Sequence, residues 1–147
     1  MSEISWDLFH EQVSACTMCP LHATVTNKVP GQGDRNAPLM LIGEGPGQTE
    51  DEQGLAFVGA AGQLLTRMLA AISLPRERVY ICNVVKCRPP GNRVPEETEV
   101  QACMLHLRMQ VALVKPKVIL LLGATAARAT AASRTPRRRA ARQAHLR

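Results

Sequence analysis

The sequence predicts an α/β fold in which three layers, α/β/α, are built around a short central parallel sheet. Two observations lead to this prediction. Short apolar runs alternate with amphipathic stretches in the order strand, helix, strand, helix, strand, which is typical of a parallel sheet covered by helices on both faces. Two of the runs, 38–43 and 117–123, end in glycine, and the first is apolar throughout, as buried parallel strands are. A chain of 147 residues is long enough for one domain with its own core.

The elements of the amino-terminal half follow from spacing and capping. Trp6 and Phe9 recur at helical spacing behind Ser5, whose hydroxyl can cap a helix. The run PLMLIG (38–43) is the first predicted strand. In GQLLTRMLAAI (62–72), apolar residues recur every three or four positions, so this segment is predicted to be an amphipathic helix.

The second half of the chain continues the alternation. The run RVYICNVV (78–85) is rich in β-branched and aromatic residues and is predicted to be a strand. Residues 86–95 contain three prolines, which remove backbone donors, so we expect a loop. Pro95 suits a first helical position and glutamates follow it, which favours a helix that runs to about Val114. The strand 117–123 comes last.

The net charge of +6 is concentrated near the carboxyl end. Seven of the 18 basic residues lie in 128–147, which contains no acid, and the remaining 11 stand against 12 acids. The total charge therefore does not make the whole chain a basic nucleic-acid binder. We expect a domain over 1–127 and an Arg/Ala-rich tail over 128–147 that is largely disordered, with a helix over 124–132 at the junction.

Hydropathy and the first residues indicate the compartment. No apolar run is long enough to cross a bilayer, so we expect no membrane association. The start, MSEISWDLFHEQ, lacks the basic and then apolar layout of a secretion signal, so we expect a cytoplasmic protein. In that reducing compartment, five cysteines indicate ligands or core residues more than disulfides.

Four cysteines form a candidate metal site. Cys16 and Cys19 have CxxC spacing, Cys87 lies in the proline-rich loop, and Cys103 lies early in the following helix. Four thiolates from three segments could hold a [4Fe–4S] cluster or a zinc ion. Alternatively, the CxxC is incidental and Cys103 is a buried helix residue. Cys82 is expected in the core. Three histidines are further possible ligands, although lone histidines are more often structural: His10, His22 and His106.

Three features together resemble one enzyme family. GEGPGQTEDEQGLAFVGAAGQLL (43–65), YICNVVKCRPPGNR (80–93) and the spacing of the four cysteines are similar to type-4 uracil-DNA glycosylases over roughly residues 1–127. The resemblance implies a DNA repair enzyme that hydrolyses the N-glycosidic bond of uracil flipped out of DNA. It also implies uracil-containing DNA as the partner, a monomer, and a structural [4Fe–4S] cluster. The implied cluster ligands are Cys16, Cys19, Cys87 and Cys103.

The resemblance also assigns site residues. Phe57 would stack on the uracil ring and Asn83 would read its edge with one donor and one acceptor, although a core phenylalanine and a turn-capping asparagine are the ordinary alternatives. The remaining substrate-contacting positions are Gly43 and Gly47. The catalytic candidates are Glu44, Gly45 and Glu50. Other branches of the superfamily have an aspartate where this sequence has Gly45, so Glu44 and Glu50 are the available carboxylates, unless Glu50, Asp51 and Glu52 form only a solvated acidic turn.

The DNA backbone would be contacted by two further groups. The segment Gly59–Gly62 opens a helix and can accept a phosphate at its amide groups. Positive charge near the same face would come from three residues, Lys86, Arg88 and Arg93.

The resemblance ends near Gly123. Relatives carry a later His-Pro-Ser or His-Pro-Ala motif after a further strand, and this sequence has none; His145 is not followed by proline and does not take that role. We expect the final strand of the family fold to be missing, an exposed sheet edge, and impaired excision. A frameshift or an alternative gene end would produce such a sequence, and resequencing the locus would test this.

Two other functions compete with excision. A noncatalytic relative would bind uracil or DNA without turnover. An iron–sulfur electron carrier would show a reversible redox couple but would have no use for Phe57 or Asn83. A P-loop protein is excluded, because the sequence lacks G-x-x-x-x-G-K-[ST].

Overall fold

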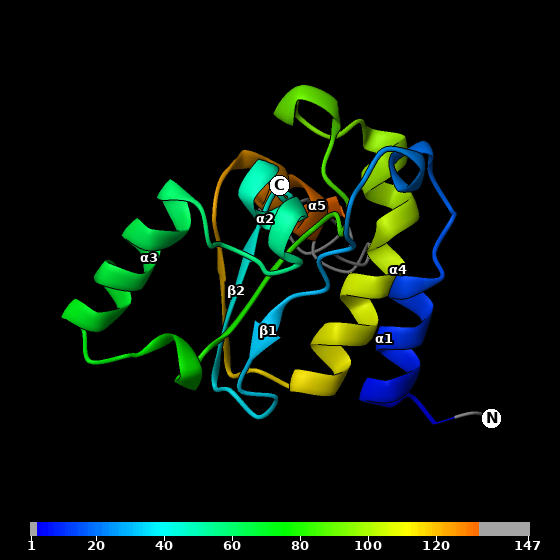
Figure 1. Cartoon of the computed structure of the whole chain (residues 1–147). Helices are drawn as coiled ribbons and strands as arrows, with labels where there is room; N and C mark the ends of the chain where they lie inside the picture. The colour runs from blue at the N-terminus through cyan, green and yellow to red at the C-terminus, as the bar shows by residue number, and fades with distance from the viewer. Residues whose placement is uncertain (1–2, 133–147) are drawn as a thin grey trace, which may run out of the picture.

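The computed structural model describes residues 3–132, and it confirms the three-layer α/β/α fold (Figure 1). A four-stranded sheet with the strand order β1-β3-β2-β4 lies at the centre. The strands are β1 (Gln32–Gly33), β2 (Leu39–Gly43), β3 (Tyr80–Asn83) and β4 (Val118–Leu121). The α-helices are α1 (Trp6–Ser14), α2 (Gln48–Gln53), α3 (Ala60–Ala71), α4 (Glu97–Val114) and α5 (Ala124–Ala132). Short 3₁₀ turns occupy Pro20–Ala23, Arg76–Arg78 and Pro90–Asn92.

The sheet is mixed, which corrects the expectation of a wholly parallel sheet. β3, β2 and β4 are parallel, but β1 pairs with β3 in the antiparallel sense. β1 lies between α1 and β2, in a segment for which the sequence predicted no helix or strand. Two residues give no alternating pattern, so sequence periodicity could not have found this strand.

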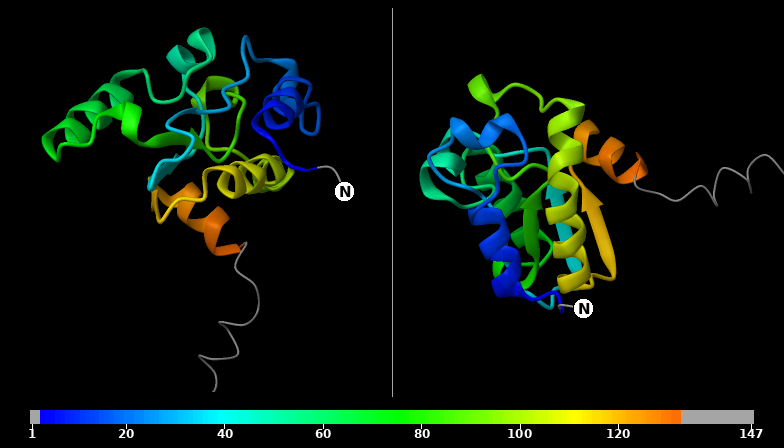
Figure 2. Two further views of the ribbon diagram at one scale, coloured as in Figure 1. Left: turned by 90° about the horizontal axis from the view of Figure 1, so that it is seen from below. Right: turned by 90° about the vertical axis from the view of Figure 1, so that its right-hand side faces the viewer.

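Each face of the sheet has its own core. Met40, Ile42 and Cys82 pack with α4 and α5 on one face, as part of a cluster that also includes Trp6 of α1. Leu41 and Ile81 pack with α3 on the other face. Consecutive strand residues thus serve opposite layers, as the alternation of side chains along a strand requires. Figure 2 shows the sheet between α3 and the pair α1 and α4.

Several predicted helix signals are confirmed. The Ser5 hydroxyl accepts a hydrogen bond from the backbone N–H of Leu8 and caps α1. α4 begins after Glu96, with the side chain of Glu99 accepting the N–H of Glu96. The expected helix over 124–132 is α5, while the remainder of the predicted tail, 133–147, lies outside the described residues. α2 was not predicted, because all six of its residues are polar and give no apolar period.

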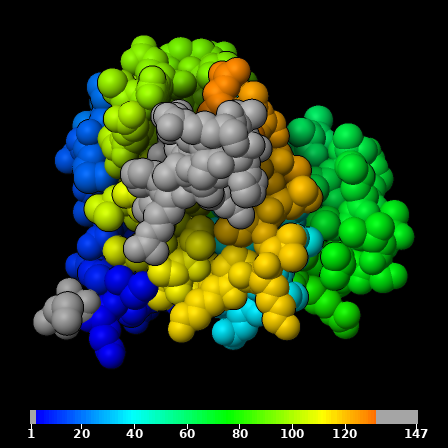
Figure 3. Space-filling model, turned by 180° about the vertical axis from the view of Figure 1, so that it is seen from behind, coloured from blue at the N-terminus to red at the C-terminus, as the bar shows by residue number. Residues whose placement is uncertain are grey.

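The strand β4 forms one edge of the described sheet. Three consecutive apolar residues on it are exposed: Val118 by 58%, Ile119 by 37% and Leu120 by 46%. The view from behind shows this segment at the surface (Figure 3). The exposed edge agrees with the sequence prediction. No helix within residues 3–132 combines the length and apolar character needed to cross a membrane.

Candidate functional site

Two parallel strands bring the predicted base-binding residues together. β2 ends at Gly43 and β3 ends at Asn83, and the two are register partners. A Cβ placed on Gly43 would lie 2.4 Å from Cζ of Phe57 and 2.6 Å from Oδ1 of Asn83. The aromatic ring and the amide therefore meet over the backbone of Gly43, where only glycine leaves room. This is the carboxyl-end edge at which α/β sheets bind ligands.

The amide of Asn83 is not used elsewhere in the described part of the fold. Asn83 is 2% exposed, and its side chain makes no hydrogen bond with another residue of the range 3–132. The alternative that it caps a turn therefore has no bond to support it. An amide that lacks a protein partner is suited to a ligand with complementary donors and acceptors.

Phe57 is held in an uncommon backbone conformation. Its φ is +54°, in the left-handed region that bulky residues rarely occupy. Arg76 donates to the carbonyl oxygens of Phe57, at 2.5 Å, and Ala56, at 2.8 Å. On the other side, a Cβ on Gly62 would lie 2.0 Å from the Phe57 carbonyl carbon. Arg76 and Gly62 thus fix the ring over Gly43. Sequence reasoning missed Arg76, for which no motif gave a signal.

Glu50 organises the loop between β2 and α3. Its Oε1 accepts from the N–H of Gly47 at 3.0 Å, and its Oε2 accepts from the N–H groups of Val58 at 3.0 Å and Gly59 at 2.6 Å. The carboxylate therefore shapes the loop that carries Phe57. The Gly59 amide, which we expected to face a DNA phosphate, is bonded to Glu50. A direct role for Glu50 in orienting water stays a prediction.

The acidic run around Glu50 is not a uniformly solvated turn. Asp51 is 5% exposed and accepts hydrogen bonds from the backbone N–H groups of Thr26 and Asn27. Only Glu52 is exposed to solvent among the three acids. Asp51 thus ties α2 to the segment that precedes β1, which gives it a structural role.

Glu44 and Gly45 follow β2 directly. Oε2 of Glu44 accepts from the hydroxyl of Thr125 at 2.5 Å, which links the loop to the start of α5. A Cβ on Gly45 would lie 2.7 Å from a methyl group of Val85. The position of Gly45 is therefore too close to the loop after β3 for a larger side chain without movement of Val85. The catalytic roles of Glu44 and Gly45 stay predictions.

The expected basic DNA face needs one correction. Lys86 is 1% exposed, because its ammonium group donates to the backbone carbonyl of Asn83 at 2.7 Å and to Oε1 of Gln110. The prediction that Lys86 contacts DNA is therefore wrong. Arg93 forms a two-pronged ion pair with Glu99, at 2.8 and 2.9 Å, and Arg88 donates to Asn92. DNA contacts by Arg88 and Arg93 stay predictions.

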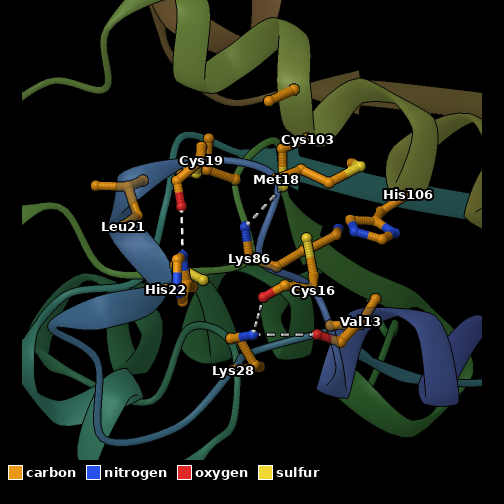
Figure 4. Close-up of a pocket in the computed structure, with 13 residues that line it drawn as sticks. Val13, Cys16, Met18, Cys19, Leu21, His22, Lys28, Lys86, Cys103 and His106 are labelled. Atoms are coloured by element: carbon orange, nitrogen blue, oxygen red, sulfur yellow. Dashed lines mark hydrogen bonds between the residues drawn. The ribbon is translucent and has the colours of Figure 1, made fainter.

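The four predicted cluster ligands line one cavity (Figure 4), formed by the turn after α1, the loop after β3 and the second turn of α4. All five cysteines of the chain are free thiols, and Cys82 is buried in the core as predicted. The cavity-lining cysteines are Cys16, Cys19, Cys87 and Cys103. Burial raises the pKa of the Cys87 thiol to about 12 and also raises that of Cys103. A metal must therefore displace protons to bind there.

The thiols do not converge on one point. Within residues 3–132, no three His, Cys, Asp or Glu side chains come close enough together to hold a single metal ion. In a [4Fe–4S] cluster each thiolate binds a different iron, so the four ligand sulfurs surround the whole cluster and do not share one metal ion. Four cysteine thiols around a shared cavity are the donor set that such a cluster requires.

Two lysines and two histidines share the lining of this cavity. Lys28 donates to the carbonyl oxygen of Cys16 at 2.7 Å. His22 Nδ1 lies 2.7 Å from the carbonyl oxygen of Cys19. His106 is 3% exposed, and burial, followed by the charges of Lys86 and Lys28, lowers its pKa. His10 lies outside the lining, on α1 beside Trp6.

Comparison with known proteins places the chain in one superfamily. The model of the family described as the uracil DNA glycosylase superfamily matches residues 30–145, which continues past the boundary predicted at 127. The chain is 49% identical to a type-4 uracil-DNA glycosylase of Pyrobaculum aerophilum, over 82% of this chain and 61% of that protein. It is 50% identical to the type-4 enzymes of Thermotoga maritima, over 82% of this chain and 62% of the relative, and Archaeoglobus fulgidus, over 84% and 62%. The chain spans about three fifths of the length of these curated relatives. With this match over most of its length, the chain belongs to the uracil DNA glycosylase superfamily.

Proposed function

We propose that this protein is a DNA repair glycosylase that binds uracil flipped out of DNA and hydrolyses its N-glycosidic bond. The observation that carries the proposal is the meeting of Phe57 and Asn83 over Gly43. An aromatic face and an unused amide at one glycine are what a planar pyrimidine needs for stacking and for recognition of its edge. The type-4 glycosylases to which the chain is similar support the same substrate.

Binding has to offset the cost of extruding a base, which is a few kcal/mol of stacking and pairing. In our proposal Phe57 supplies stacking and Asn83 supplies hydrogen bonds. Bond cleavage then builds positive charge on the sugar, which a carboxylate stabilises. Glu44 is the proposed carboxylate, because the two oxygens of Glu50 already accept three backbone N–H groups.

We also propose that the four cysteines hold a [4Fe–4S] cluster. The support is the set of four free thiols that line one cavity. The cluster would supply a covalent tie between the turn after α1, the loop after Asn83 and α4, and no redox step in the reaction. Iron and sulfide analysis of anaerobically purified protein tests this, and one zinc ion per chain would contradict it.

Two further proposals concern the location and the oligomeric state of the protein. We propose a reducing, cytoplasmic location because all five cysteines are free thiols. We propose that the protein is a monomer, which light scattering of the purified chain tests; a concentration-independent dimer would contradict it.

Excision is tested with a labelled single-stranded oligonucleotide that contains one uracil, followed by alkali and gel electrophoresis. We expect strand scission that falls by on the order of 10²-fold in Phe57→Ala and Asn83→Ala, because each removes a contact to the base. The matched control is Asn36→Ala, an exposed asparagine in the turn before β2.

Binding measurements separate the competing functions. Fluorescence anisotropy should show tighter binding to the uracil oligonucleotide than to the same sequence with thymine. Uracil-dependent binding without scission would favour the noncatalytic relative. A reversible redox couple with no DNA binding would favour the electron carrier, for which the Phe57 and Asn83 arrangement has no use.

A further inference from the structure

His106 is buried without a hydrogen-bond partner. It lies on α4 one turn after Cys103, and its side chain lines the cysteine cavity. Both ring nitrogens are buried, and neither has a hydrogen-bond partner among residues 3–132. Figure 4 shows the imidazole among the residues that line this cavity. A buried polar group without a partner costs about 1–3 kcal/mol, so a group that binds in the cavity is the natural partner.

The other polar side chains of the lining are already bonded. The ammonium groups of Lys28 and Lys86 donate to backbone or side-chain oxygens. His22 has the Cys19 carbonyl oxygen as its partner. Among the described residues, His106 is therefore the side chain of this lining whose buried ring nitrogens both lack a partner, and the acceptors that a bound cluster would bring are sulfur atoms.

We propose that His106 donates a ring N–H to a sulfur of the iron–sulfur cluster, either an inorganic sulfide or a ligating cysteine sulfur. The inference rests on the cluster proposed above. It makes His106 a positioning residue that orients and tunes the cluster without ligating it. Hydrogen bonds to the sulfurs withdraw electron density from the iron–sulfur bonds and raise the reduction potential, as partners of metal ligands commonly do.

The test compares the full chain with three variants after anaerobic purification and cluster reconstitution. His106→Leu removes the donor at similar volume, His106→Gln keeps a side-chain N–H, and His10→Leu is the matched control outside the cavity. The readouts are iron and sulfide content, resonance Raman Fe–S stretching frequencies and the reduction potential. None of them depends on excision of uracil.

We expect His106→Leu to shift the Fe–S stretches to higher frequency and the potential to a more negative value. We expect His106→Gln to lie closer to the wild type and His10→Leu to match it. Loss of the cluster in His106→Leu but not in His106→Gln would also support the proposal. Unchanged frequencies and potential in His106→Leu, or identical shifts in both His106 variants, would overturn it.

A measurement on the unmodified sequence covers the case in which neither His106 variant folds. In protein with ¹⁵N-labelled histidine, pulsed EPR of the reduced cluster should detect coupling to a ring nitrogen. A ring that bonds only a buried water would give no coupling and would overturn the inference. Zinc or no metal in the wild type would overturn both this inference and the cluster proposal, whereas an intact cluster without coupling would overturn this inference alone.

Discussion

The side chains of Lys86 and Gln110 meet inside the protein, with 2.6 Å between Nζ and Oε1. Both residues are almost fully buried. Nζ of Lys86 also donates to the carbonyl oxygen of Asn83, and Nε2 of Gln110 donates to the hydroxyl of Tyr80 at 2.8 Å. This network joins α4 to both ends of β3. It therefore supports the strand that carries Asn83 to the proposed base-binding site.

The first prediction concerns Lys86→Met. The substitution leaves the carbonyl of Asn83 and the amide oxygen of Gln110 buried without a donor, so we expect a loss of about 2–3 kcal/mol in the free energy of unfolding. Urea denaturation measures it. Lys117→Met, at an exposed lysine, should stay within about 0.5 kcal/mol of the wild type. Equal stability of the two variants would show that the buried network contributes nothing.

The second prediction concerns Glu50→Ala. Three backbone N–H groups lose a charged acceptor, so the loop between β2 and α3 should open more easily, by about 1–3 kcal/mol. Hydrogen exchange should become faster at the amides of Gly47, Val58 and Gly59. The control is Glu52→Ala, which removes an exposed carboxylate of the same helix. Unaltered exchange at these three amides in Glu50→Ala would contradict the organising role.

The third prediction compares two glycines. Gly62→Ala would place a methyl group 2.0 Å from the carbonyl carbon of Phe57, so we expect a loss of at least about 3 kcal/mol in stability. Gly91 has a φ of +62° but open space around its Cα, so Gly91→Ala should cost only about 1–2 kcal/mol of backbone strain. Thermal unfolding measures both. A Gly62→Ala variant as stable as Gly91→Ala would mean that Phe57 moves freely.

The fourth prediction concerns pH and the pair Arg93 and Glu99. Hydrogen bonding from Arg93, followed by that from the Glu96 backbone, lowers the pKa of Glu99. The ionised carboxylate therefore stabilises the fold at pH values above its unfolded pKa of about 4.3, and this contribution is lost as the pH falls through the lower folded pKa. Glu99→Gln should thus be less stable than the wild type at pH 7, and the difference should shrink towards pH 3.

Urea denaturation across that pH range measures this difference. Other acids titrate equally in both proteins, so the difference isolates Glu99. Glu97→Gln, at an exposed position of the same helical turn, should differ from the wild type by an amount that hardly varies with pH. A Glu99→Gln difference that is constant with pH would exclude the ion pair as its source.

The sequence was sufficient to predict the layers of the fold, because its apolar runs are long enough to distinguish strands from amphipathic helices. β2, β3 and α4 are within a few residues of their predicted bounds. It was insufficient for β1 and α2, which are too short or too polar for any pattern. Lys86 was misassigned to the surface because a lysine in a basic loop is usually solvated, and only the three-dimensional contact with Gln110 reveals its burial.

The candidate site likewise could be predicted only in part from the sequence. Gly43, Phe57 and Asn83 could be named from motifs, because motifs record which residue types a ligand requires. The residues that hold Phe57 in place could not be named from motifs. Arg76 and Gly62 act on Phe57 through the backbone carbonyl, a contact that depends on how the loop and the 3₁₀ turn before β3 come together. A hydrogen bond to a backbone carbonyl does not depend on the side chain of the residue that accepts it, so no sequence motif indicates such a contact.

The edge strand β4 has a practical consequence. Successive side chains on a strand point to opposite faces, so exposure of Val118, Ile119 and Leu120 together means that both faces of this strand meet water. Such a strip can template the pairing of one molecule with the next. Concentrated preparations of the protein should consequently become turbid on storage, and a single lysine in place of Ile119 should keep them clear.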